Sequence, residues 1–212
     1  MLTEKQIQGN KDEFLEIVSE ITTEDADTEG LVKFLLDSDF FEAPASSKYH
    51  CNFKGGLCQH SLNVYKNLCA LVAIYAPGKY FDDTLRTVAL FHDLSKTNFY
   101  TTYTKKFKNY SIKGKFTDEK GKYDWDEEEY YSVKDAKDRL LARDHEVNSC
   151  FLLQKYIPLT DEEAIAIMNH HGGWGLDVMK AGEVSAIYEK YTLAILLHMA
   201  DLASVYIDER NE

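Results

Sequence analysis

Apolar side chains recur at helical spacing along most of the chain, which predicts a mainly α-helical protein. Residues 4–21 place Ile7, Phe14 and Ile17 on one side, as in an amphipathic helix. Thr28 is a candidate cap for a second helix, and Asp82 or Asp83 for a central helix that carries His92 and Asp93. The same periodicity predicts further helices over residues 57–75, 144–156, 160–171 and 188–209.

The pattern changes between residues 99 and 133, where Thr and Tyr alternate with other residues. Two such runs flank a turn-like segment at 118–121, so we expect a β-hairpin inserted at about 100–132. Its first half is basic and its second half is acidic. Two interpretations are open: the strands pair opposite charges, or the hairpin is a lid whose Lys105 and Lys106 contact a phosphate-bearing substrate.

The length of 212 residues fits one domain with an appendage. We expect helices and a loop in residues 1–54 to pack on a main domain formed by residues 55–212. The sequence has no run of 18 or more apolar residues, and its polar N-terminus does not resemble a signal peptide. Four cysteines without a CxxC pair are typical of reduced thiols, so we expect a cytoplasmic protein without a membrane partner.

The formal net charge of −12 disfavours binding of long nucleic acid through a general basic surface. A small anionic substrate stays compatible with this charge, because a bound metal ion can supply positive charge locally.

The run from Val88 to Lys96 is apolar except for an adjacent His92 and Asp93 and the closing Lys96. Neighbouring side chains on a helix project about 100° apart, so this pair can flank one ion or bridge two. An ionisable pair in an apolar helix needs a compensating partner or a metal.

Other candidate ligands lie on separate predicted elements. They are His60, His145, His170 and His171, together with Asp201 in an apolar stretch near the C-terminus. A buried carboxylate such as Asp201 needs a cation or strong hydrogen-bond donors. Imidazoles mixed with carboxylates suit zinc, iron or manganese better than calcium.

In this order, the histidines, the His-Asp pair and Asp201 resemble the ligand series of the HD-domain metallophosphohydrolase superfamily. The segments Gly-Gly-Leu-x-x-His, His-Asp-Leu-Ser-Lys and His-His-Gly are also similar to landmarks of that family. The resemblance covers about residues 55–205 and implies an HD-domain helical bundle. The extra histidines resemble its dinuclear branch, in which one metal would bind His60, His92, Asp93 and Asp201. His145, His170 and His171 would hold the second metal, and Asp93 would bridge both.

The resemblance implies a metal-dependent phosphohydrolase or phosphodiesterase acting through metal-activated water. The expected substrate is a nucleotide, a cyclic nucleotide or a short oligonucleotide. Asp93 and Lys96 would be the catalytic residues, with Lys96 also contacting a phosphate oxygen, and Trp174 would stack on a base. A solvent-facing Lys96 and an ordinary core Trp174 are the simpler alternatives.

Alternative functions are a 3′-to-5′ exonuclease-like nuclease and a non-catalytic nucleotide-binding HD protein. A centre with a single metal is a further alternative. The ligand types do not choose among iron, manganese, zinc, nickel and magnesium, and the sequence does not set the oligomeric state.

Four further residues are weaker candidates. His198 lies one turn before Asp201 and would either orient that carboxylate or be a hydrogen-bonded core histidine. His50 lies near two cysteines, but the spacing is wrong for a zinc knuckle. Lys48 and Tyr49, in the loop before His60, are candidates for lining the mouth of the site.

Overall fold

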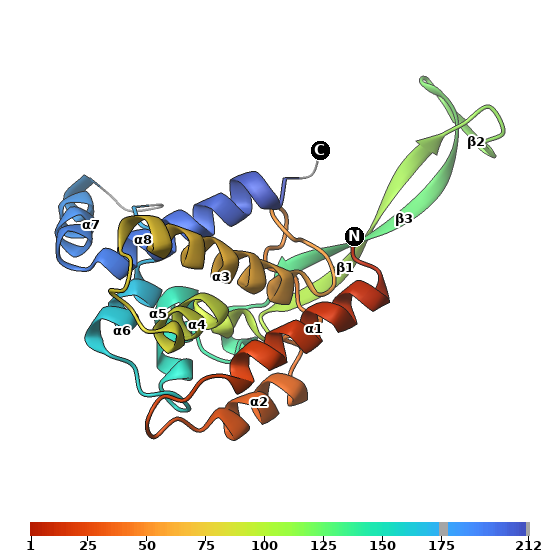
Figure 1. Ribbon diagram of the computed structural model, residues 1–212. Helices are drawn as coiled ribbons and strands as arrows, with labels where there is room; N and C mark the ends of the chain where they lie inside the picture. Colours follow the sequence, from red (N-terminus) through yellow and green to blue (C-terminus); the bar gives the residue numbers. More distant parts are fainter. Residues whose placement is uncertain (174–177, 211–212) are drawn as a thin grey trace.

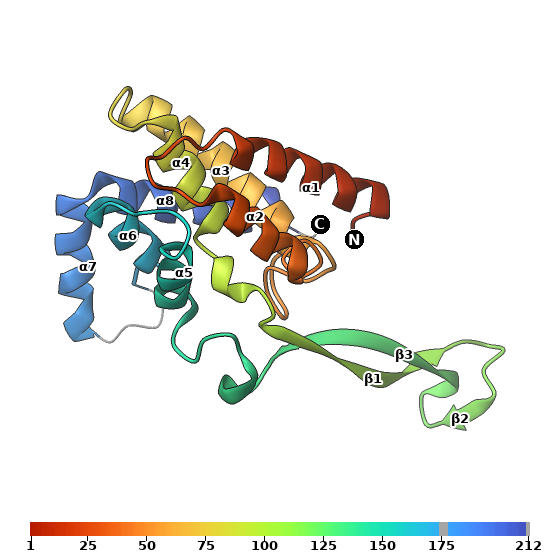
Figure 2. The ribbon, with the colours of Figure 1, turned by 90° about the horizontal axis from the view of Figure 1, so that it is seen from below.

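The computed structural model describes residues 1–173 and 178–210, without the side chains of 178–181, and is mainly helical. A bundle of helices forms one body, from which a long β-hairpin projects (Figures 1 and 2). The helices are α1 (Glu4–Ser19), α2 (Thr28–Asp37), α3 (Gly56–Tyr75), α4 (Asp82–Phe91), α5 (His145–Leu153), α6 (Asp161–Met168), α7 (Val178–Lys190) and α8 (Thr192–Ala203). None of these described helices is both long and apolar enough to cross a membrane.

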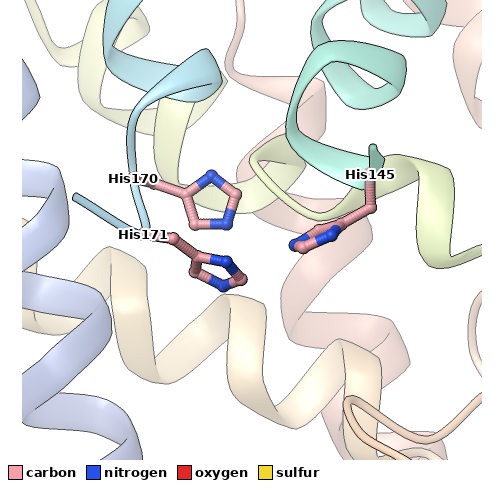
Figure 3. Close-up of side chains that lie close together, drawn as sticks. All are labelled: His145, His170 and His171. Carbon is pink, nitrogen blue, oxygen red and sulfur yellow. The ribbon is translucent and has the colours of Figure 1, made fainter. Parts of the chain in front are cut away.

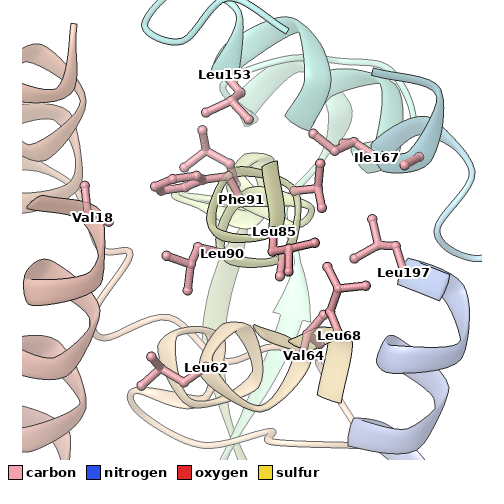
Figure 4. Close-up of a cluster of buried hydrophobic side chains, with 14 of the residues drawn as sticks. Val18, Leu62, Val64, Leu68, Leu85, Leu90, Phe91, Leu153, Ile167 and Leu197 are labelled. Atoms are coloured by element: carbon pink, nitrogen blue, oxygen red, sulfur yellow. The ribbon is translucent and has the colours of Figure 1, made fainter. Parts of the chain in front are cut away.

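Helix α4 lies at the centre of the hydrophobic core. Figure 4 shows its Leu85, Leu90 and Phe91 surrounded by apolar side chains of α1, α3, α5, α6 and α8. Phe14 of α1 packs edge-on against Phe91, with ring centroids 5.7 Å apart. Residues 1–54 therefore share one core with the rest of the chain, and their burial fixes α3 and α4 in place.

The starts of two helices differ from the sequence prediction. Asp27, and not Thr28, caps α2, because its carboxylate accepts a hydrogen bond from the Gly30 N–H at 2.8 Å. No described side chain caps α4, so the prediction for Asp82 or Asp83 was wrong. Asp83 instead accepts hydrogen bonds from Thr22, which ties the α1–α2 connection to α4.

Helix α4 also ends earlier than predicted, at Phe91, so that His92 and Asp93 follow the helix and are not carried within it. A short 3₁₀ turn at Leu94–Lys96 comes next. The turn is held against α5, since the Ser95 N–H donates to Ser149 Oγ at 3.1 Å and Ser95 Oγ donates to the His145 carbonyl at 2.8 Å. After this change of direction, Asp93 faces His145 of α5 and His92 faces His60 of α3.

The predicted helix over 188–209 is divided. The backbone becomes extended at Tyr191, which separates α7 from α8. After α8, a turn of π-helix at Ser204–Asp208 widens the helix and precedes Glu209. Turns of this kind often occur at functional sites.

The predicted hairpin is confirmed, with one added strand. Strand β1 (Tyr100–Tyr110) pairs antiparallel with β3 (Gly121–Val133), and the short β2 (Phe116–Asp118) pairs with the other edge of β3. The turn at 118–121 therefore joins β2 to β3, and not the two long strands. Most of the side chains of β1 are exposed.

Opposite charges meet across this sheet, as one interpretation of the sequence expected. Lys106 Nζ lies 2.9 Å from Glu127 Oε1, and Lys108 Nζ lies 2.5 Å from Asp118 Oδ2. Lys105 stands opposite Glu128 in the strand register. The aromatic rings of Tyr103 and Tyr130 stack at 5.8 Å. These cross-strand pairs stabilise a sheet that has little buried surface of its own.

Candidate metal centre

The fold brings the seven predicted metal ligands together from five separate segments. They are His60 of α3, His92 and Asp93 after α4, His145 of α5, His170 and His171 after α6, and Asp201 of α8. All but His145 and His171 are almost fully buried. Residues far apart in the sequence thus form a single polar cluster inside an apolar core.

The first group contains His60, His92, Asp93 and Asp201. The Nε2 atoms of His60 and His92 lie 3.2 Å apart, and His60 Nε2 lies 3.2 Å from Asp201 Oδ1. The Nδ1 atom of His92 lies 2.8 Å from the Ala89 carbonyl, to which it donates a hydrogen bond. With its Nδ1 used as a donor, His92 turns its Nε2 toward His60, the orientation of a metal-binding histidine.

The second group contains His145, His170 and His171. Figure 3 shows their three rings close together, each from a different position on the backbone. His170 Nδ1 donates to the Ile167 carbonyl at 2.7 Å, which leaves its Nε2 as an acceptor. Among the described residues, the buried Nε2 atoms of His145 and His170 have no hydrogen-bond partner. Such an unsatisfied group is costly, and a cation would satisfy both nitrogens.

Asp93 lies between the two groups and presents one oxygen to each. Its Oδ2 lies 3.5 Å from His92 Nε2 and 3.7 Å from His60 Nε2. Its Oδ1 lies 3.5 Å from His145 Nε2 and 3.6 Å from His170 Nε2. The carboxylate of Asp93 is therefore shared by the two groups of candidate ligands, and its Oδ2 also contacts Lys96 Nζ at 2.7 Å.

The charges differ between the two groups of candidate ligands. Burial opposes ionisation of Asp93, but Lys96 and His92 outweigh it and hold its pKa well below the usual value. Burial, together with Lys96, lowers the pKa of His145 to about 3, so this ligand is neutral with a free lone pair. Burial also opposes a charge on His60, yet Glu209 and Asp201 outweigh it and raise its pKa to about 10. The pocket around His60 thus attracts positive charge, which a metal ion can supply in place of a proton.

Two carboxylates of the site were missed in the sequence. Glu209 Oε1 lies 3.0 Å from His60 Nδ1 and accepts a hydrogen bond from Asn63 Nδ2 at 2.9 Å. Glu146 contacts both His145 and His171. Its position beside His145 is a signal that could have been used, whereas Glu209 has no comparable neighbour in the sequence.

Two further histidines support the centre. His198 Nδ1 donates to the His170 carbonyl at 2.5 Å, so it holds the turn that carries the double histidine and does not orient Asp201. The rings of His50 and His60 lie 4.8 Å apart. His50 groups with His60 and Glu209 among the described residues, and not with the cysteines. Because His60 Nδ1 already faces Glu209, we interpret Glu209 and His50 as residues that hold His60 in place, and not as ligands of a further metal ion.

An open cavity of about 860 Å³ adjoins the cluster. His171 and Asp201 form part of its wall. As expected, Lys48 and Tyr49 also line it, and Tyr206 and Arg210 lie on the same wall. The cavity gives a small ligand access to the candidate metal ligands.

The remaining predicted substrate contacts lie elsewhere. Lys96 is buried, with its Nζ 2.7 Å from Asp93 Oδ2, so the interpretation of a solvent-facing lysine was wrong. Lys105 and Lys106 are exposed on β1 of the projecting hairpin. Trp174 lies outside the described residues.

No family model, curated protein or solved structure matches the chain. A function therefore has to be inferred from the chemistry of the cluster and its cavity.

Proposed function

We propose that this chain is an HD-type metal-dependent phosphohydrolase that hydrolyses a small phosphate ester, with a nucleotide as the preferred class of substrate. The observation that carries the proposal is Asp93, whose two oxygens face two separate groups of histidines. Imidazoles combined with carboxylates suit iron, manganese or zinc. The first group of ligands and the second group would hold one cation each.

The candidate ligands offer nitrogen and oxygen lone pairs, which such cations bind. The buried, unpartnered Nε2 atoms of His145 and His170 call for an electron-pair acceptor, in the part of the chain that the structure describes. When bound, two divalent cations would neutralise phosphate oxygens and lower the pKa of a water molecule, so that it attacks phosphorus near neutral pH.

The side chains of the protein would orient the substrate and select among phosphate esters. Lys96 is held against Asp93 and compensates the charge of this carboxylate inside the core. Lys48 and Arg210 offer hydrogen-bond donors along the cavity, and the largely exposed rings of Tyr49 and Tyr206 offer surfaces on which a base can stack. The cavity volume of about 860 Å³ falls within the range of about 300–1,000 Å³ that is usual for small-ligand sites.

The test is elemental analysis of protein purified without chelator or affinity tag, in parallel with the Asp93→Asn variant. The variant conserves the size of the side chain but removes the charge that would bridge two cations. We expect about two transition-metal ions per wild-type chain and fewer in the variant. Reconstituted protein would then be assayed with Mn²⁺ or Fe²⁺ on nucleoside phosphates, cyclic nucleotides and short oligonucleotides.

Each outcome decides between the alternatives. Wild-type protein that holds no metal and takes up none on reconstitution overturns the proposal. Two bound metals without hydrolysis of any of these phosphate esters would favour the non-catalytic nucleotide-binding alternative. Hydrolysis that is lost in Asp93→Asn supports the phosphohydrolase.

A further inference from the structure

Glu146, in the first turn of α5, contacts two candidate metal ligands at once. Its Oε2 lies 3.3 Å from Nδ1 of His145, and its Oε1 lies 2.9 Å from Nδ1 of His171. The two histidines belong to different segments, separated by all of α6. Their imidazole rings lie 4.7 Å apart at centroid and are oriented edge to face.

A neutral imidazole carries a single N–H, and the atom that donates it determines which nitrogen stays free. An ionised carboxylate accepts hydrogen bonds on both oxygens, so Glu146 can accept one from each Nδ1. Both Nε2 atoms are then left with lone pairs. Each carboxylate oxygen of Glu146 faces a different Nδ1, so one side chain supplies an acceptor to both imidazoles.

We propose that Glu146 is the positioning residue of the second group of ligands, and that it sets the tautomer and ring orientation of His145 and His171 together. The inference rests on the proposed function, in which this group holds a cation. The third member, His170, has an acceptor of its own in the Ile167 carbonyl. Glu209 has the corresponding place at His60 in the first group.

The substitution Glu146→Gln tests the proposal, because an amide has a single acceptor oxygen for the two N–H donors. Metal-free protein would be titrated with Mn²⁺ and with Zn²⁺ by calorimetry, and its metal content measured. Loss of a residue that orients a ligand usually weakens metal affinity by about 10- to 100-fold. We expect a loss of this size at one of two sites, with the other unchanged.

Three further variants test whether the loss of metal affinity comes from the contacts of Glu146 with the second group of ligands. Asp144→Asn removes a nearby exposed charge that makes no capping hydrogen bond, and we expect it to leave both affinities unchanged. Glu209→Gln should weaken the other site. In a His145→Ala background, where the second site is already lost, Glu146→Gln should have no further effect on the remaining site.

The outcomes separate this inference from the function on which it rests. Wild-type protein without bound metal overturns the proposed function. Two wild-type sites that keep their affinities in Glu146→Gln overturn the role of Glu146 and leave the proposed function standing. If Glu146→Gln does not fold, nitrogen NMR of metal-free wild-type protein decides: Nδ1–H tautomers at both His145 and His171 support the proposal, and an Nε2–H tautomer at either residue overturns it.

Discussion

The ammonium nitrogen of Lys96 lies 2.7 Å from Oδ2 of Asp93, and both side chains are buried. Burial opposes the charge of Lys96, but Asp93 outweighs it and raises the pKa of the lysine. The two residues therefore form a buried ion pair. A single buried ammonium compensates a carboxylate that also faces four imidazoles.

Replacing Lys96 with Met should destabilise the metal-free protein by about 3 kcal/mol, because the carboxylate of Asp93 then stays buried without its partner. Bound cations would supply the missing charge, so the loss should be smaller in metal-loaded protein. Urea denaturation with a chelator and with Mn²⁺ measures both values. An equal loss in the two conditions would show that no cation binds near Asp93.

His145→Ala should reduce the metal content to about one ion per chain and remove most of the hydrolytic rate, because the second group of ligands is then incomplete. Asp144→Asn is the control, since Asp144 is exposed beside His145 and is not a predicted ligand. Metal analysis and initial rates check both variants. A metal content near one with full activity in His145→Ala would establish a mononuclear centre instead.

Tyr49→Ala and Tyr206→Ala should each raise KM for nucleotides by about tenfold, the effect expected when a stacked base loses about 1.4 kcal/mol. Phosphate esters without a base should be hydrolysed as before. Steady-state kinetics on a nucleoside monophosphate and on phenyl phosphate provide the comparison. The same loss on both substrates would mean that the tyrosines shape the cavity without reading a base.

Reversing the charges of Lys105 and Lys106 should leave KM for a small substrate unchanged, since both side chains are exposed on the hairpin. The exonuclease alternative predicts the opposite for an oligonucleotide, with weaker binding that depends steeply on salt. Binding of a fluorescent oligonucleotide at two salt concentrations distinguishes these outcomes. Restoring the cross-strand pair with Glu127→Lys controls for damage to the sheet.

Asp83→Asn should cost about 1 kcal/mol of stability at neutral pH, because it weakens the hydrogen bonds from Thr22. Burial opposes ionisation of Asp83, but Thr22 and Arg86 outweigh it and lower its pKa. A lowered folded-state pKa gives stability that is present above the unfolded value of about 3.9 and is lost as the pH falls through the folded value.

The difference between wild type and Asp83→Asn should therefore shrink in acid. Urea denaturation at pH 7 and near pH 3 measures it, and Asp82→Asn in the same helical turn is the control. A difference that stays constant over this range would mean that the wild-type carboxylate titrates alike in the folded and unfolded chains.

Part of the cluster of candidate ligands could be predicted from sequence because some of its members are polar residues in apolar surroundings. His60, His92 and Asp201 lie among residues that must be buried, so their polar atoms had to find partners in the interior. The end of α4 could not be predicted in the same way. The apolar run continues past Phe91 to Leu94, and the turn is held by Ser149, which is distant in sequence.

Glu209 could not be selected from 36 acidic residues, since its role depends on the imidazole nitrogen that lies within hydrogen-bond distance in the fold. Glu146 stands beside His145 in the sequence, but its contact with His171 depends on the fold. Strand β2 was missed because three residues are too few to show an alternating pattern. It pairs with β3 across the short turn at Glu119 and Lys120.

The contact between His60 and Glu209 joins residues 149 positions apart. On a ribosome, His60 would emerge long before the carboxylate that orients it has been synthesised. A growing chain that already exposes the first histidines thus lacks a complete set of ligands and their supports. Under the proposed function, selective metal capture would be delayed until the segment through Glu209 has emerged and folded.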